Sequence, residues 1–125
     1  MRDTIQKLID EAGGNIQAIE QIRDVLHELS PINSQPVDRV RWVPVEIVEP
    51  NDYNPNSVAS KEMKLLYISI KHDGYTQPIV TIWDDQRKKY VIVDGFHRYF
   101  TCKNNPDIYE RNQGLLPIVV IKKTM

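Results

Sequence analysis

The residues of this chain best suited to chemistry lie in one short segment, residues 92–98. An apolar run ends there at Asp94 and Gly95, and two side chains that can carry positive charge, His97 and Arg98, follow at once. A strand that turns at a glycine and opens a helix presents backbone N–H groups without intrahelical partners, together with the positive end of the helix dipole. Arginine can add a bidentate grip on an anion. The segment therefore predicts an anion or nucleotide site.

The alternative for this segment is an ordinary strand-to-helix turn with solvated side chains. Such a turn needs Gly95, but it has no use for His97 and Arg98 at a helix N-terminus, where cations oppose the dipole. Function is expected where residues break a local rule. We therefore favour the anion site over the plain turn.

Composition narrows the class of protein. The 125 residues include 16 basic and 17 acidic ones with no long run of either sign, so we expect DNA contact to be weak or indirect. The single Cys102 excludes an intrachain disulfide, and the three histidines lack metal-ligand spacing, so no metal site is predicted. The sequence shows no signal peptide and no apolar stretch near the roughly 20 residues that span a bilayer. We expect a soluble cytoplasmic protein.

The first 30 residues predict a helical hairpin. Apolar residues recur at helical spacing over 4–12 and again from Ile16 to Leu29, with a Gly-Gly break between the two runs and Asn15 as a helix cap. Two short helices bury little by themselves, so the apolar stripe must pack on the main domain or on another protomer. Residues 4–29 are thus a candidate arm for a protein partner or for self-association. Residues 31–39, with two prolines, predict a linker.

Residues 40–125 mix strand and helix patterns. Strands are predicted at 40–48, 79–83, 90–93 and 116–121, the middle two forming a hairpin. Helices are predicted from Ser60 to about His72, ended by Gly74, and at about 98–103. The expected fold class is α/β (α+β), a small mixed sheet with flanking helices behind the N-terminal helical hairpin.

The order of several elements resembles the ParB/sulfiredoxin superfamily over about residues 40–122. These elements are a Pro-Asn-Asp loop at 50–52, a helix ending near Gly74, the phrase Gln77-Pro78-Ile79-Val80, an acidic hairpin turn and Val93-Asp94-Gly95-Phe96-His97-Arg98-Tyr99. The resemblance implies a pocket that binds a nucleotide, which is ATP, ADP or CTP in different branches, with Mg²⁺ as a companion ion. By the same resemblance, the phosphates lie on Gly95, His97 and Arg98, and the pocket is lined by Thr76, Gln77, Pro78 and Asp94.

Departures from the family pattern bear on activity. Sulfiredoxins carry a cysteine directly before the His-Arg pair, whereas this chain has Phe96, which has no nucleophile, so sulfiredoxin activity is not expected. In the serine-kinase branch a carboxylate two residues after the loop proline is the catalytic acid or base, and Asp52 matches it. There it would orient a hydroxyl or hold Mg²⁺. The alternative is an Asx turn, which we favour slightly. We expect a binding module, with a Mg²⁺-dependent phosphotransferase or nucleotide hydrolase using Asp52 as the alternative.

The resemblance also bears on biological role. ParB clamps need a further nucleotide-closing segment and a helix-turn-helix after this domain, and the sequence ends at Met125, so we expect neither a DNA clamp nor a nuclease. The phrases at 26–31, 51–56 and 73–78 resemble the IbrB-like group of ParB-type co-activators of prophage gene expression. That resemblance implies a nucleotide-binding regulatory module in prophage or mobile-element gene expression.

Overall fold

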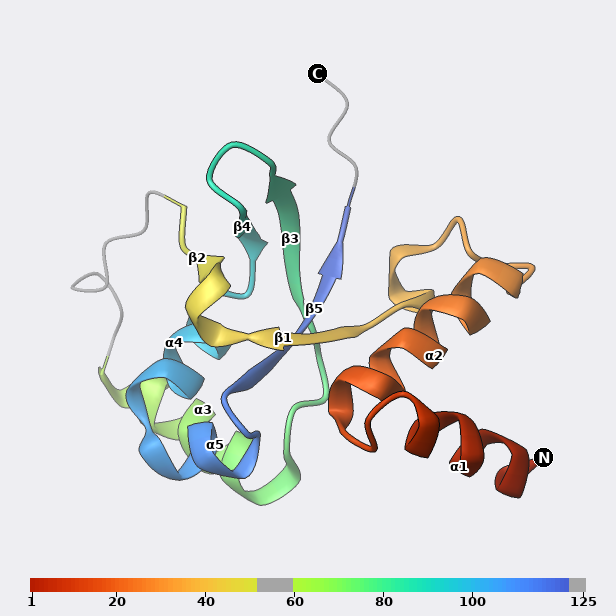
Figure 1. Cartoon of the computed structure of the whole chain (residues 1–125). Coiled ribbons are helices and arrows are strands. Elements are labelled where there is room, and N and C mark those ends of the chain that lie inside the picture. The colour runs from red at the N-terminus through yellow and green to blue at the C-terminus, as the bar shows by residue number, and fades with distance from the viewer. Residues whose placement is uncertain (52–59, 122–125) are drawn as a thin grey trace. The chain divides into compact units, whose positions relative to one another are not determined.

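The computed structural model describes residues 1–51 and 60–121 (Figure 1). Contacts divide the chain into two units, Met1–Arg39 and Val40–Met125. The first unit contains the two expected helices, α1 (Arg2–Glu11) and α2 (Ile16–Leu29). The side chain of Asn15 accepts a hydrogen bond from the N–H of Ala18 at 3.0 Å, so the predicted cap of α2 is confirmed.

The segment predicted as a linker is bound to α2. It contains a 3₁₀ helix, η1 (Pro36–Asp38), and the Asp38 carboxylate lies 2.8 Å from Nδ1 of His27. Arg39 is buried and donates from Nε to the carboxylate of Asp24 at 2.9 Å. Asp38 and Arg39 hold the segment in place because each contacts a side chain of α2.

The second unit is built on a five-stranded mixed sheet with the strand order β1-β5-β3-β4-β2. The β3/β4 and β1/β5 pairs are antiparallel, and the β3/β5 and β2/β4 pairs are parallel. The predicted hairpin and the last strand are present. The strands are β1 (Arg41–Pro44), β2 (Val48–Glu49), β3 (Ile79–Asp84), β4 (Lys89–Asp94) and β5 (Leu115–Val120).

The prediction of one strand over residues 40–48 is wrong in detail. The segment forms two strands at opposite edges of the sheet, β1 and β2, joined by the 3₁₀ helix η2 (Val45–Ile47). Pro44 ends β1 because proline has no N–H to donate and a fixed φ. The N–H of Val45 donates to the carbonyl of Gly114 at 2.9 Å, one position beyond the β1/β5 pairing, and the chain then continues as η2.

Three helices, α3 (Ser60–Asp73), α4 (Phe96–Asn104) and α5 (Pro106–Arg111), lie next to one another in Figure 1. Helix α3 turns Ile70 into the core and ends before Gly74, as predicted. Helix α4 begins two residues before the predicted start because Gly95 itself caps it. Helix α5 was not predicted. The predicted α/β fold class is confirmed, and no described helix is long and apolar enough to cross a membrane.

Candidate functional site

The turn at Gly95 joins β4 directly to α4. Gly95 is buried with φ +105°, a conformation that favours glycine, and the first helical hydrogen bond runs from the N–H of Tyr99 to its carbonyl at 3.0 Å. The register of β3 against β4 shifts between Val80 and Thr81, so that Val80 faces the exposed Asp94 where the strand enters the turn. Such irregularities often lie next to binding sites. The turn therefore has the geometry that the sequence predicted.

The half-buried Arg98 lies on the inner side of this turn. Its terminal nitrogen donates to the carbonyl of Pro78 at 3.5 Å, at the long limit of a hydrogen bond. Its Nε is buried and has no hydrogen-bond partner among the described residues. A buried donor without a partner is costly unless a ligand or water satisfies it. Arg98 thus carries unused capacity to bind an anion.

The structure brings some of the predicted site residues together. Pro78, Gly95 and Arg98 lie in one cluster, because the loop after α3 passes the N-terminus of α4. Thr76 and Gln77 are exposed on that loop, and His97 is exposed on the first turn of α4. These three residues are exposed and accessible to a ligand. The candidate catalytic residue Asp52 lies outside the described residues.

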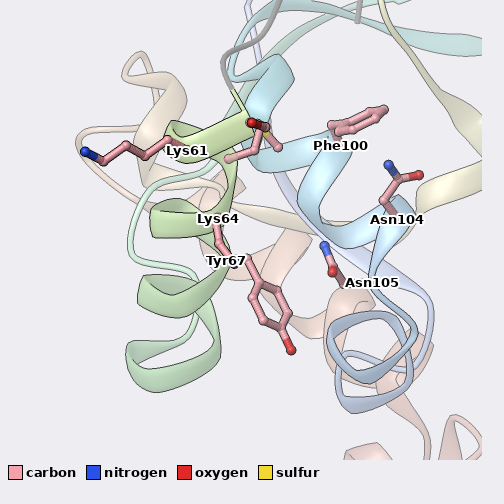
Figure 2. Close-up of a pocket in the computed structure, with 8 residues that line it drawn as sticks. Lys61, Lys64, Tyr67, Phe100, Asn104 and Asn105 are labelled. Atoms are coloured by element: carbon pink, nitrogen blue, oxygen red, sulfur yellow. The ribbon is translucent and has the colours of Figure 1, made fainter. Parts of the chain in front are cut away.

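Sequence reasoning missed a cleft of about 750 Å³ between α3 and α4 (Figure 2). Lys64 and Tyr67 stand on α3, Phe100 stands on α4, and Lys61 extends from the rim away from α4. Among the described residues, the lining contains two lysines, two amides and no carboxylate, which favours an anionic ligand. The described residues that line the cleft are Ser60, Lys61, Met63, Lys64, Tyr67, Phe100, Asn104 and Asn105. Lys61 and Lys64, and likewise Phe100 and Asn104, are spaced to lie on one face of a helix. This spacing was the signal in the sequence that could have indicated the cleft.

Aromatic rings connect the glycine turn to this cleft. The ring of Phe96 lies 5.9 Å from that of His97 and 5.6 Å from that of Phe100, which lines the cleft. The far wall is held by Tyr67, whose hydroxyl donates to the carboxylate of Asp107 at 2.6 Å. Phe96 itself is buried, so these rings pack beneath the surface between the turn and the cleft.

Two further groups near the turn are neutral. Cys102 is fully buried, and burial raises the pKa of its thiol to about 11, so it is a core residue rather than a nucleophile at neutral pH. Burial also raises the pKa of the Tyr75 phenol, next to Cys102. Over residues 1–51 and 60–121, no group of three His, Cys, Asp or Glu side chains could hold a metal ion.

A mixed sheet with this glycine turn is the architecture of the ParB/sulfiredoxin superfamily. The chain belongs to the ParB N-terminal domain family, which matches residues 30–106. It is 46% identical over 109 residues to the uncharacterized protein YbdM of Escherichia coli (strain K12), a match that covers 87% of this chain and 52% of the relative. The chain thus spans about half the length of this curated relative.

Solved structures share the fold. ParB from Caulobacter crescentus complexed with CTP-γ-S matches with a TM-score of 0.55 and 25% identity, over 69% of this chain and 46% of that chain. Sulfiredoxin from Arabidopsis thaliana matches with a TM-score of 0.53 and 22% identity, over 69% and 88%. SbnI from Staphylococcus aureus matches with a TM-score of 0.53 and 19% identity, over 71% and 33%. The latter two similarities concern the fold alone.

Proposed function

We propose that the second unit is a nucleotide-binding regulatory module. The phosphates bind at the Gly95 turn, held by the first-turn N–H groups of α4 and the side chains of His97 and Arg98. The observation that carries this proposal is the buried Nε of Arg98, which lies beside a helix N-terminus opened by glycine and has no hydrogen-bond partner in the part of the chain that the structure describes. The CTP-γ-S in the similar ParB structure supports a nucleotide as the ligand class.

The rest of the nucleotide lies in the cleft between α3 and α4. Phe100 and Tyr67 supply flat apolar faces for a base, and Lys64 supplies a positive charge. Asn104 and Asn105 supply amides, and the Nδ2 of Asn105 already donates to the carbonyl of Thr101 at 2.8 Å, which leaves its carbonyl oxygen as an acceptor. Thr76 and Gln77, on the loop that reaches Arg98 through Pro78, complete the phosphate end of the pocket.

Mg²⁺ fits this site as a companion of the phosphates. The ion is usually held by one or two carboxylates together with phosphate oxygens and water, not by a complete protein cage. Asp94 is the exposed carboxylate beside the turn and would supply that ligand.

The regulatory role rests on the resemblance to IbrB-like co-activators of prophage gene expression and on the helical arm. Leu8, Val25, Leu26 and Leu29 are large apolar residues of α1 and α2 that remain exposed. Exposed apolar side chains on an amphipathic helix favour contact with a protein partner. In this proposal the nucleotide site controls what the arm binds.

The test is calorimetry with ATP, ADP, CTP and GTP, each with and without Mg²⁺, on the wild type and on Arg98→Ala. We expect Arg98→Ala to weaken the bound nucleotide about 10- to 150-fold, since hydrogen bonds to charged groups contribute about 1.5–3 kcal/mol. Arg87→Ala is the matched control, because Arg87 is exposed on the β3/β4 hairpin and pairs with Asp84. Wild-type protein that binds none of the four nucleotides would refute the proposal.

A further inference from the structure

The hydroxyl of Tyr75 donates a hydrogen bond to the backbone carbonyl of Arg98 at 2.6 Å. Tyr75 opens the loop that runs to Pro78, and the side chain of Arg98 donates back to the Pro78 carbonyl. The loop and the first turn of α4 are therefore tied in both directions. One bond holds the main chain of Arg98, and the other holds its guanidinium.

The two bonds differ in strength. The Tyr75 bond is short and half-buried, and the raised pKa of Tyr75 keeps its hydroxyl protonated, so it remains a donor at physiological pH. The Arg98–Pro78 bond measures 3.5 Å, and Nε of the same guanidinium has no partner among the described residues. An anion can therefore draw the guanidinium from Pro78 at little cost, while the main chain stays fixed.

We propose that Tyr75 is a positioning residue of the nucleotide site: it fixes the backbone of Arg98, so that only the guanidinium moves when phosphate binds. This inference rests on the proposed function. Pre-organised binding groups lose less freedom on binding, so the bond from Tyr75 raises affinity without touching the ligand. The Tyr75 hydroxyl acts as a neutral, protonated phenol. Its contribution to affinity should therefore not change with pH across the physiological range.

The substitution Tyr75→Phe removes the hydroxyl and retains the ring. We expect affinity for inorganic triphosphate with Mg²⁺ to fall about 3- to 10-fold, which matches the net contribution of one neutral hydrogen bond. The second readout is the NMR signal of the Arg98 Nε–H in ligand-free protein. It should shift and exchange faster with water in Tyr75→Phe, because the arginine is less well held.

Tyr109→Phe is the matched control. Like Tyr75, Tyr109 belongs to the second unit and donates a hydrogen bond from its hydroxyl, but its partner is the carboxylate of Glu46. Its loss should leave both the triphosphate affinity and the Arg98 signal unchanged. Thermal unfolding of each variant separates loss of fold from loss of positioning.

The outcomes separate this inference from the proposed function. Unaltered triphosphate affinity and an unaltered Arg98 signal in Tyr75→Phe overturn the positioning role, even if the wild type binds CTP. An equal effect of Tyr109→Phe on the Arg98 signal also overturns it. A changed Arg98 signal in Tyr75→Phe alone supports the hold of Tyr75 on Arg98. If the wild type then binds no nucleotide, the proposed function is refuted together with the role of Tyr75 in nucleotide affinity, while its hold on Arg98 stands.

Discussion

A terminal guanidinium nitrogen of Arg98 lies 3.0 Å from the point that a Cβ on Gly95 would occupy. On the other side, Cγ1 and Cα of Ile79 lie 3.2 and 3.3 Å from the same point. Glycine is thus required at this position for two reasons, its positive φ and the close approach of Arg98 and β3. The arginine can fold over the turn only because residue 95 has no side chain.

The first prediction concerns Gly95→Ala. The variant should lose about 1–2 kcal/mol of unfolding free energy from backbone strain, plus a further loss from contact with Ile79. Nucleotide affinity should fall because the methyl group displaces Arg98. Urea unfolding and calorimetry measure the two effects.

Gly74→Ala provides the control for that variant. Gly74 has φ +78°, and apart from its chain neighbours no atom of the described residues lies within 4 Å of an added Cβ, so the substitution costs strain alone. Nucleotide affinity should therefore remain close to that of the wild type. Equal losses of affinity in the two variants would show that the space at Gly95 does not matter to binding.

The second prediction concerns the lysines of the α3/α4 cleft. Lys61→Gln and Lys64→Gln should each weaken nucleotide binding about two- to fivefold at low salt, because exposed charge pairs contribute up to about 1 kcal/mol. The loss should shrink as salt rises, since exposed charges are screened. Lys7→Gln on α1 is the matched control. Unchanged affinity in both cleft variants at low salt would place the nucleotide elsewhere.

The local elements of this fold could be read from the sequence. Gly74 and Gly95 mark the end of α3 and the start of α4, because positive φ is a property of glycine itself. The β3/β4 hairpin follows from two apolar runs and a charged turn. The binding site at Gly95 stays a prediction, and the sequence indicates it because the residues that would carry its chemistry lie within a few consecutive positions.

The remaining features depend on contacts between distant residues. After Pro44, the N–H of Val45 bonds to the carbonyl of Gly114, and no local sequence pattern predicts that partner. The cleft needs the exposed face of α3 to meet that of α4, which spacing alone does not specify. Helix α5 is six residues long and buries only Ile108, so its apolar signal is too short to detect.

The third prediction concerns Arg111, which holds the end of α3. Its two terminal nitrogens donate to the carbonyls of Ile70 and Lys71, each at 2.8 Å, and so satisfy the last turn of that helix. Arg111→Ala should lower the unfolding free energy by about 1–2 kcal/mol in urea titration. Arg87→Ala, which breaks exposed ion pairs, should cost much less. A loss no larger than that of Arg87→Ala would show that Arg111 is only a solvated charge.

The fourth prediction concerns pH and Cys102. Burial raises the pKa of its thiol from 9.0 to about 11, so the unfolded chain ionises first as the pH rises. The contribution of this group to stability is constant below pH 9.0 and falls as the pH rises from there through about 11. Urea unfolding at increasing pH should show that decline, and Cys102→Ala should reduce it, leaving the part due to other groups whose pKa is raised, among them Tyr75 and Tyr109. Thiolate absorbance appearing in folded protein near pH 9.0 would contradict the raised pKa.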